Sequence, residues 1–227
     1  MTACVAGDSD GDDTIDGGAD SDTLDFSAGT GSLTLNLAVT SAQALGGTYG
    51  SDTISNVENV TGTGQADVIT GSSVANIING GDSADTLEGG GGVDTLTGGS
   101  GADIFRYEAL ADGESVASGT GAGITGDSII GFSTGVDKLF FDTNDFGNLS
   151  LGNLTDGVNF SVISTVYDGT NAGTNLEFDA GRDSFIFSTS DLRLVYDSDG
   201  AANGYQVMAT LDSGSVAASD VEIFSGT

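Results

Sequence analysis

The chain has 227 residues, of which 38 are glycine and none is proline, and 37% are apolar. Glycine is costly inside helices, so this composition argues against a helical protein, while the apolar fraction argues against a disordered one. The net charge of −30 argues against binding to nucleic acid or to an anionic membrane surface, because both need Lys and Arg. No segment approaches the ~20 apolar residues of a membrane span, so we expect no membrane insertion.

The acidic residues are concentrated where no basic residue can balance them. Residues 1–105 contain 16 acids and no base, and the four basic residues are Arg106, Lys138, Arg182 and Arg193. We interpret the missing positive charge as bound metal cations. A solvated acidic surface is the alternative.

Two units of nine residues, DSDGDDTID and GGADSDTLD, occupy residues 8–25. In each unit an aspartate precedes a large apolar residue by two positions, which pairs Asp13 with Ile15 and Asp22 with Leu24. The period breaks between residues 26 and 61. There the segment SLTLNLAVT alternates leucine with polar residues, which predicts a strand within a β insert.

The nine-residue period returns in residues 62–106. Large apolar residues recur at Ile69, Ile78, Leu87, Leu96 and Phe105, and two positions before them stand Asp67, Asn76, Asp85, Asp94 and Asp103. The last three units read GGDSADTLE, GGGGVDTLT and GGSGADIFR. Glycine supplies the positive φ angles and the close backbone approach that a tight turn needs.

This pattern, G-G-x-G-x-D-x-U-x with U a large apolar residue, resembles the RTX calcium-binding nonapeptide. The resemblance implies an all-β chain with a parallel β-roll, in which each unit is a six-residue turn and a short strand, and two units make one coil. Residues eighteen apart then stack. We therefore expect Ile69, Leu87 and Phe105 to line one sheet, and Ile78 and Leu96 the other.

Stacked aspartates predict several bound Ca²⁺ ions. Carboxylates about 4.8 Å apart repel by about 3 kcal/mol, and a hard cation between successive turns reverses the sign. The chain offers few of the ligands that zinc prefers, because it has no histidine and one cysteine. We expect the clean sites around 80–103 and weak or absent sites at 62–79, where turn glycines are missing. The candidate ligand residues of the roll are Asp13, Asp22, Asp67, Gly80, Gly81, Asp85, Gly89, Gly90, Gly92, Asp94, Gly98, Gly99, Gly101 and Asp103.

The stretch GDSIIGFSTGVDKLFFD, residues 126–142, resembles the segment that follows the roll in serralysin-type proteases. That resemblance adds Asp127 and Asp137 to the candidate metal ligands. The ending SDVEIF resembles a C-terminal type I secretion signal, which implies a type I exporter as a partner and an extracellular location. The predicted domains are a roll over 1–106, with repeat blocks 8–25 and 62–106, and a β-sandwich-like cap over 107–227. An ordinary β-sandwich is the alternative for the cap.

The residue types argue against an enzyme. The chain has no histidine and no Gly-x-Ser-x-Gly motif, and its prominent carboxylates belong to the repeats. We expect a secreted, non-enzymatic calcium-binding protein that folds on extracellular Ca²⁺ and self-associates into a surface layer, matrix or filament. The alternative is the calcium-dependent folding and export module of a larger RTX protease, lipase or adhesin. A third hypothesis is binding of a surface polysaccharide through exposed Ca²⁺, as in the RTX modules of alginate epimerases.

Overall fold

The computed structural model describes residues 3–5, 11–109, 112, 114–115, 126–142, 152–153, 160–163, 184–197 and 206–224. The elements defined in them are β-strands and the 3₁₀ helix η2 (Ala218–Asp220). The chain divides into two compact units, residues 1–105 and 106–227. The all-β fold class that the repeats predict is therefore confirmed.

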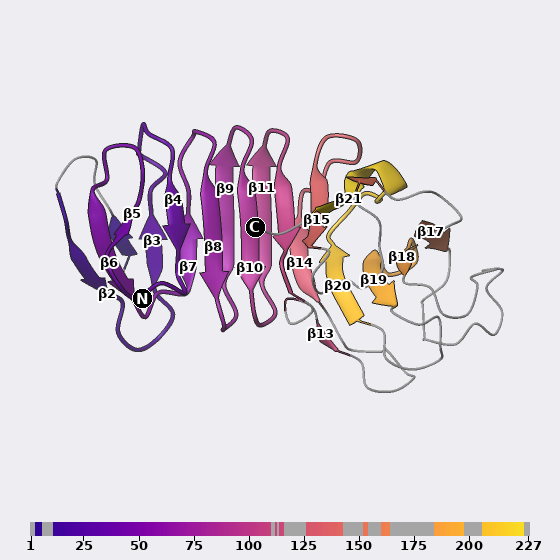
Figure 1. Cartoon of the computed structure of the whole chain (residues 1–227), viewed down its shortest axis with the longest axis horizontal. Helices are drawn as coiled ribbons and strands as arrows, with labels where there is room; N and C mark the ends of the chain where they lie inside the picture. Colours follow the sequence, from indigo (N-terminus) through magenta and orange to yellow (C-terminus); the bar gives the residue numbers. More distant parts are fainter. Residues whose placement is uncertain are drawn as a thin grey trace. The chain divides into compact units, whose positions relative to one another are not determined.

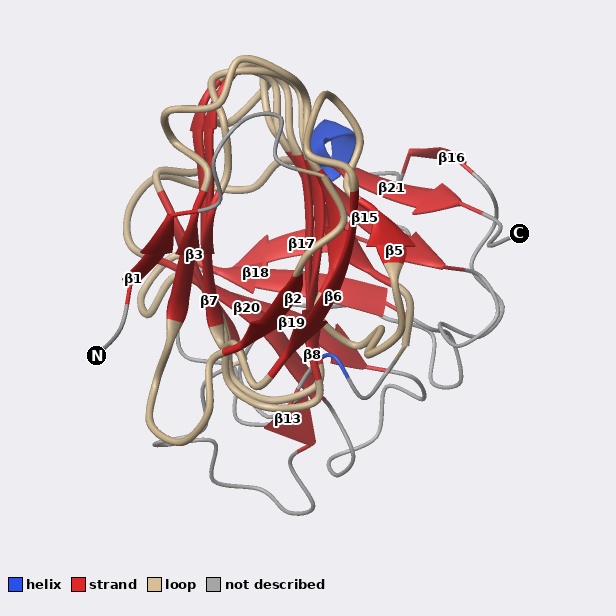
Figure 2. Cartoon of the chain, turned by 90° about the vertical axis from the view of Figure 1, so that its left-hand side faces the viewer, coloured by secondary structure: helices blue, strands red, loops and turns tan. Residues whose placement is uncertain are grey.

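The first unit is a roll built of short parallel strands in two main sheets. One sheet runs in the order β1 (Ala3–Val5), β3 (Thr23–Asp25), β7 (Asn59–Thr61), β9 (Ile77–Asp82) and β11 (Thr95–Ser100). The other runs in the order β4 (Thr34–Asn36), β8 (Val68–Ser72), β10 (Thr86–Gly90) and β12 (Ile104–Tyr107). In Figure 1 strands β8 to β11 follow one another along the roll. Figure 2 shows the roll from its end, with β3 and β7 on one side and β8 on the other.

The apolar residues of the repeats stack from coil to coil. Leu87 lies opposite Ile69 and Phe105 in one sheet, and Ile78 lies opposite Leu96 in the other. All five side chains are fully buried. The predicted eighteen-residue stacking, and with it the parallel β-roll, is therefore confirmed.

Residues 26–61, which break the nine-residue period, also supply strands to the roll. Strand β4 pairs with β8 and places Leu35 opposite Ile69, while β7 pairs with both β3 and β9 and places Val60 opposite Leu24 and Ile78. The strand predicted in SLTLNLAVT is the three-residue β4. A small additional sheet contains β2 (Thr14–Asp16), β6 (Ser51–Ser55) and β5 (Gln43–Ala44). The predicted β insert thus continues the roll with longer connections.

The second unit contains two further groups of strands. One group is β14 (Asp127–Ile130), β20 (Gln206–Leu211), β19 (Arg193–Asp197), β18 (Ser184–Ser188), β17 (Phe160–Ile163) and the short β13 (Glu114–Ser115). The other is β15 (Lys138–Asp142), β21 (Val221–Phe224) and β16 (Gly152–Asn153). The core of the second unit includes packed aromatic rings: Phe141 packs on Tyr107 and on Phe185, with ring centroids 5.0 and 4.4 Å apart. In the described residues no helix has the length and apolar character needed to cross a bilayer.

Candidate metal centre

A polar residue two positions before each stacked apolar residue is buried in the roll. Asp67, Asn76, Asp85, Asp94 and Asp103 are each at most 1% exposed. In the aspartates, one side-chain oxygen accepts the backbone N–H of the equivalent residue one coil earlier, whereas the amide of Asn76 donates to the carbonyl oxygen of Glu58. The N–H of Asp67 donates to Asp85 Oδ1 over 2.8 Å, and that of Asp85 donates to Asp103 Oδ1 over 3.0 Å.

The same ladder runs along the opposite edge of the roll, where the N–H of Asn76 donates to Asp94 Oδ1 over 2.7 Å. The register therefore places Asp67, Asp85 and Asp103 on one edge and Asn76 and Asp94 on the other. In each ladder one carboxylate oxygen is held by the neighbouring coil. The chemistry of each turn then depends on the second oxygen.

The second oxygen of Asp85 is buried and has no hydrogen-bond partner. A Cβ added to Gly80 would overlap this Oδ2 and would lie 2.8 Å from the carbonyl oxygen of Gly98 in the next coil. Two acceptors therefore converge on the space beside the Gly80 Cα. Leaving a buried acceptor unsatisfied is costly, and a hard cation with oxygen ligands removes that cost. The residues present fit Ca²⁺ at this position.

The first glycine of each following repeat packs in the same way. A Cβ on Gly89 would overlap Asp94 Oδ2, and a Cβ on Gly98 would overlap Asp103 Oδ2. The remaining candidate glycines adopt positive φ angles, which are 112° for Gly81, 83° for Gly90, 115° for Gly92, 106° for Gly99 and 151° for Gly101. The structure thus brings the candidate ligand residues of 80–103 together as stacked, glycine-lined turns.

Two departures from the repeat pattern keep the glycine backbone conformation. Asp20 and Ser83, at the fourth position of their repeats, have φ angles of 97° and 75°. Side chains rarely adopt this region, because the Cβ crowds the backbone. The stacking of the turns imposes the glycine geometry on these residues.

The electrostatic surroundings of Asp85 oppose its negative charge. Burial raises the pKa of Asp85 to about 7, against the hydrogen bond with the backbone of Asp67, and the charges of Asp67, Asp103 and Asp82 raise it further. A bound cation would oppose each of the raising effects.

We expect acid to stabilise the metal-free roll. Because its folded-state pKa is raised from 3.8 to about 7, Asp85 contributes stability that is fully present below pH 3.8 and is lost as the pH rises through about 7. Between these limits the folding equilibrium should gain up to about tenfold per pH unit lowered. Circular dichroism in chelator from pH 8 to pH 4 measures this gain as a rise of the β signal. The Asp85→Asn variant is the control, and equal pH dependence of the two proteins would contradict the expectation.

Two members of the ladder were missed in the sequence. The N–H of Asp13 donates to Asp52 Oδ1 over 2.8 Å, and the N–H of Asp22 donates to Glu58 Oε2 over 2.9 Å. The sequence signal is an acid two positions before a buried apolar residue, here Ile54 and Val60. Val60 also lies nine residues before Ile69 and so extends the period by one unit.

The candidate ligands outside 62–103 have varied surroundings. Asp13 is exposed and Asp22 is buried. Asp127 and Asp137 are also buried, and Asp137 Oδ2 accepts the N–H of Ser133 over 2.7 Å.

In the part of the chain that the structure describes, no three acidic, cysteine or histidine side chains are placed to share one ion. A metal centre in the described roll therefore needs backbone carbonyls as ligands.

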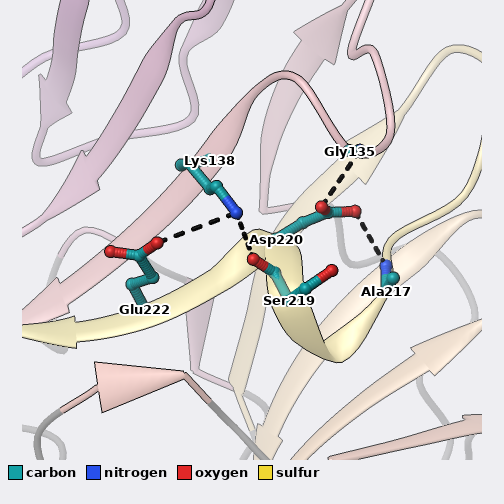
Figure 3. Close-up of polar contacts among 6 residues, drawn as sticks. All are labelled: Gly135, Lys138, Ala217, Ser219, Asp220 and Glu222. Carbon is teal, nitrogen blue, oxygen red and sulfur yellow. Dashed lines mark hydrogen bonds and ion pairs between the residues drawn. The ribbon is translucent and has the colours of Figure 1, made fainter.

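Polar contacts tie the turn that precedes β15 to the end of the chain (Figure 3). Asp220 accepts the N–H groups of Gly135 and Ala217, each over 3.0 Å. Lys138 Nζ donates to the carbonyl oxygen of Ser219 and lies 3.7 Å from Glu222 Oε1. These contacts hold η2 and β21 against β15 within the second unit.

Comparison with protein families finds four copies of the RTX calcium-binding nonapeptide repeat, at residues 8–33 and 70–105. RTX repeats bind calcium, so the chain carries a calcium-binding β-roll. The matched residues do not include 126–142 or the C-terminal SDVEIF, and the serralysin-like secretion domain stays a prediction. Among curated proteins, none matches the chain.

Proposed function

We propose that this chain is a secreted, non-enzymatic protein whose roll folds on binding extracellular Ca²⁺ and which then self-associates at the cell surface. The observation that carries the calcium-dependent folding is the buried Asp85 Oδ2, which has no hydrogen-bond donor and lies beside the carbonyl oxygen of Gly98. Self-association would depend on the same ions, because copies of net charge −30 repel one another unless cations lie between them.

We assign the first calcium position to the space between the turns 80–85 and 98–103. Asp85 and the carbonyl of Gly98 would hold the ion there, and glycine-rich turns expose further carbonyl oxygens. On the opposite edge, the turn 89–94 offers Asp94 in an equivalent ladder. Bound calcium supplies positive charge and oxygen coordination, while the chain's own residues supply the register.

Calcium concentration would then control folding. Each coil buries one large apolar side chain per nine residues, which returns about 1.5–3 kcal/mol against about 1–2 kcal/mol of backbone entropy for every residue. Extracellular calcium modules bind at about 10⁻⁴ to 10⁻³ M, so their sites fill outside the cell. A site at a hundred times its dissociation constant adds about 2.7 kcal/mol to the folded state. Several sites in a stack give a cooperative transition.

The test is a calcium titration of the chelated full chain, followed by circular dichroism and light scattering. We expect a cooperative gain of β signal together with growth in particle size. The same gain in a monodisperse monomer would favour the alternative, a folding and export module of a larger protein, which the resemblance of 126–142 also favours. A β signal that is complete in chelator would contradict calcium-dependent folding.

A further inference from the structure

The turns of the roll close in two different ways. In the turn 62–67, the N–H of Thr63 donates to Asp67 Oδ2 over 2.6 Å and its hydroxyl donates to Asp67 Oδ1 over 2.9 Å. The remaining donor is the N–H of Leu33, which reaches Asp67 Oδ1 over 2.7 Å. Both oxygens of Asp67 are therefore satisfied by the protein itself.

The turn 71–76 is closed in the same way with an uncharged side chain. The N–H and the hydroxyl of Ser72 both donate to Asn76 Oδ1, over 2.7 and 3.2 Å. The amide of Asn76 donates to the carbonyl oxygen of Glu58 over 2.7 Å. An aspartate could not make this last bond, because a carboxylate has no donor. The side chain of Asn76 thus closes the turn 71–76 with hydrogen bonds alone, without a carboxylate or a bound cation.

The residue at the second position of the turn separates the two kinds of closure. Thr63 and Ser72 hold this position in the hydrogen-bonded turns, and neither has a positive φ. Gly81 holds it in the turn 80–85, where its φ is 112° and Asp85 Oδ2 receives no hydrogen bond. Glycine accepts positive φ without cost, whereas Thr63 and Ser72 avoid it, so the residue type at this position favours one direction of the peptide N–H over the other.

The second unit contains an independent example. In the turn 131–137, Ser133 stands four residues before Asp137, and its N–H donates to Asp137 Oδ2 over 2.7 Å. Ser133 also lacks a positive φ. The same residue type in the same position therefore makes the same bond in a separate part of the protein.

We propose that the second turn position determines whether a turn is closed by calcium or by hydrogen bonds, so that the coil of 62–79 forms without calcium. Coils in a solenoid contact only their neighbours, and a coil that is already folded provides a template for the next. Residues 62–79 would then be the surface on which the calcium-dependent coils of 80–105 assemble. This inference rests on the proposed calcium-dependent folding. It adds which turn position determines calcium dependence, and that folding proceeds from residues 62–79 toward residue 105.

Hydrogen exchange on the full chain in chelator, followed by the same measurement in calcium, tests the inference. In chelator we expect the strand amides of β8 and β9 to exchange at least about a hundredfold more slowly than an unstructured peptide, as in a locally stable segment. The strand amides of β11 and β12 should exchange freely until calcium is added. Equally fast exchange of all four strands in chelator would overturn this inference alone. Protection of β11 and β12 in chelator would instead overturn the proposed calcium-dependent folding.

A substitution tests the role of the second position directly. Gly81→Ser removes the residue that permits positive φ, and the backbone N–H of residue 81 should then turn onto the carboxylate of Asp85, as the N–H of Ser72 bonds to Asn76. We expect calorimetry to find one ion fewer than in the wild type. The matched control is Gly91→Ser at the third position of a turn, where φ is not positive and the nearest atom to an added Cβ is 3.6 Å away. An unchanged ion count in Gly81→Ser, or a loss of folding at every calcium concentration, would overturn the inference.

Discussion

The Gly80→Ala variant should lose the calcium-dependent folding of the last coils. The added methyl would overlap Asp85 Oδ2 and lie 2.8 Å from the carbonyl oxygen of Gly98, and so would displace the two oxygens assigned to the ion. Overpacking of this kind costs typically about 1–3 kcal/mol, and loss of a well-filled site removes about 2.7 kcal/mol more. Since about 1.4 kcal/mol is tenfold, the calcium midpoint should rise at least about tenfold.

The matched control for this substitution is Gly91→Ala. Gly80 and Gly91 both lack a positive φ, so alanine strains the backbone of neither. An added Cβ at Gly91 makes its nearest contact at 3.6 Å, with the Cα of Ser73, which is ordinary packing. Circular dichroism at increasing calcium should therefore separate the two variants. If Gly80→Ala folds at the same calcium concentration as Gly91→Ala, the ion does not occupy the space beside Gly80.

The roll could be predicted from the sequence because its signal is periodic. One large apolar residue every nine positions indicates the face that is buried, and the resemblance to the RTX repeat implies the coil of two units that the stacking of Leu87 between Ile69 and Phe105 shows. The aspartates share this period, so their alignment along the two edges followed from the same count. Periodicity also indicated the turns, because glycine accepts the backbone angles found at Gly81 and Gly90 far more readily than other residues do.

The ladder itself could not be read from the sequence. Its donors are backbone N–H groups, which every residue carries and no motif reveals. The ladder bonds nearest the N-terminus also depart from the eighteen-residue spacing. Asp52 and Glu58 lie 39 and 36 residues from Asp13 and Asp22, whose N–H groups donate to them. Connections of irregular length, such as the one that contains β5, hide these partners. The division of the turns into two kinds depends on backbone angles, and these became visible only in the structure.

The second large effect is expected from Asp85, Asp94 and Asp103. Replacing all three with alanine removes the second carboxylate oxygen from three successive turns, and also the Oδ1 acceptors that hold Asp67, Asn76 and Asp85 N–H groups. Each lost ladder bond leaves a buried donor, at a cost of about 1–3 kcal/mol. The free energy of unfolding in calcium should therefore fall by several times the contribution of a single calcium site. We therefore expect no cooperative β transition in millimolar calcium.

The control is the triple variant Asp16→Ala, Glu108→Ala, Asp212→Ala, which removes the same charge from exposed positions outside the turns 80–103. General charge repulsion predicts that both triple variants ease folding, because each lowers the net negative charge equally. If the three buried aspartates are calcium ligands, the two variants should behave differently. The variant with exposed substitutions should fold at or below the wild-type calcium midpoint, and the variant with buried substitutions should fail to fold. The comparison therefore distinguishes a roll that calcium merely screens from one that calcium enters. A buried variant that folds at the wild-type midpoint would exclude these aspartates as the calcium ligands.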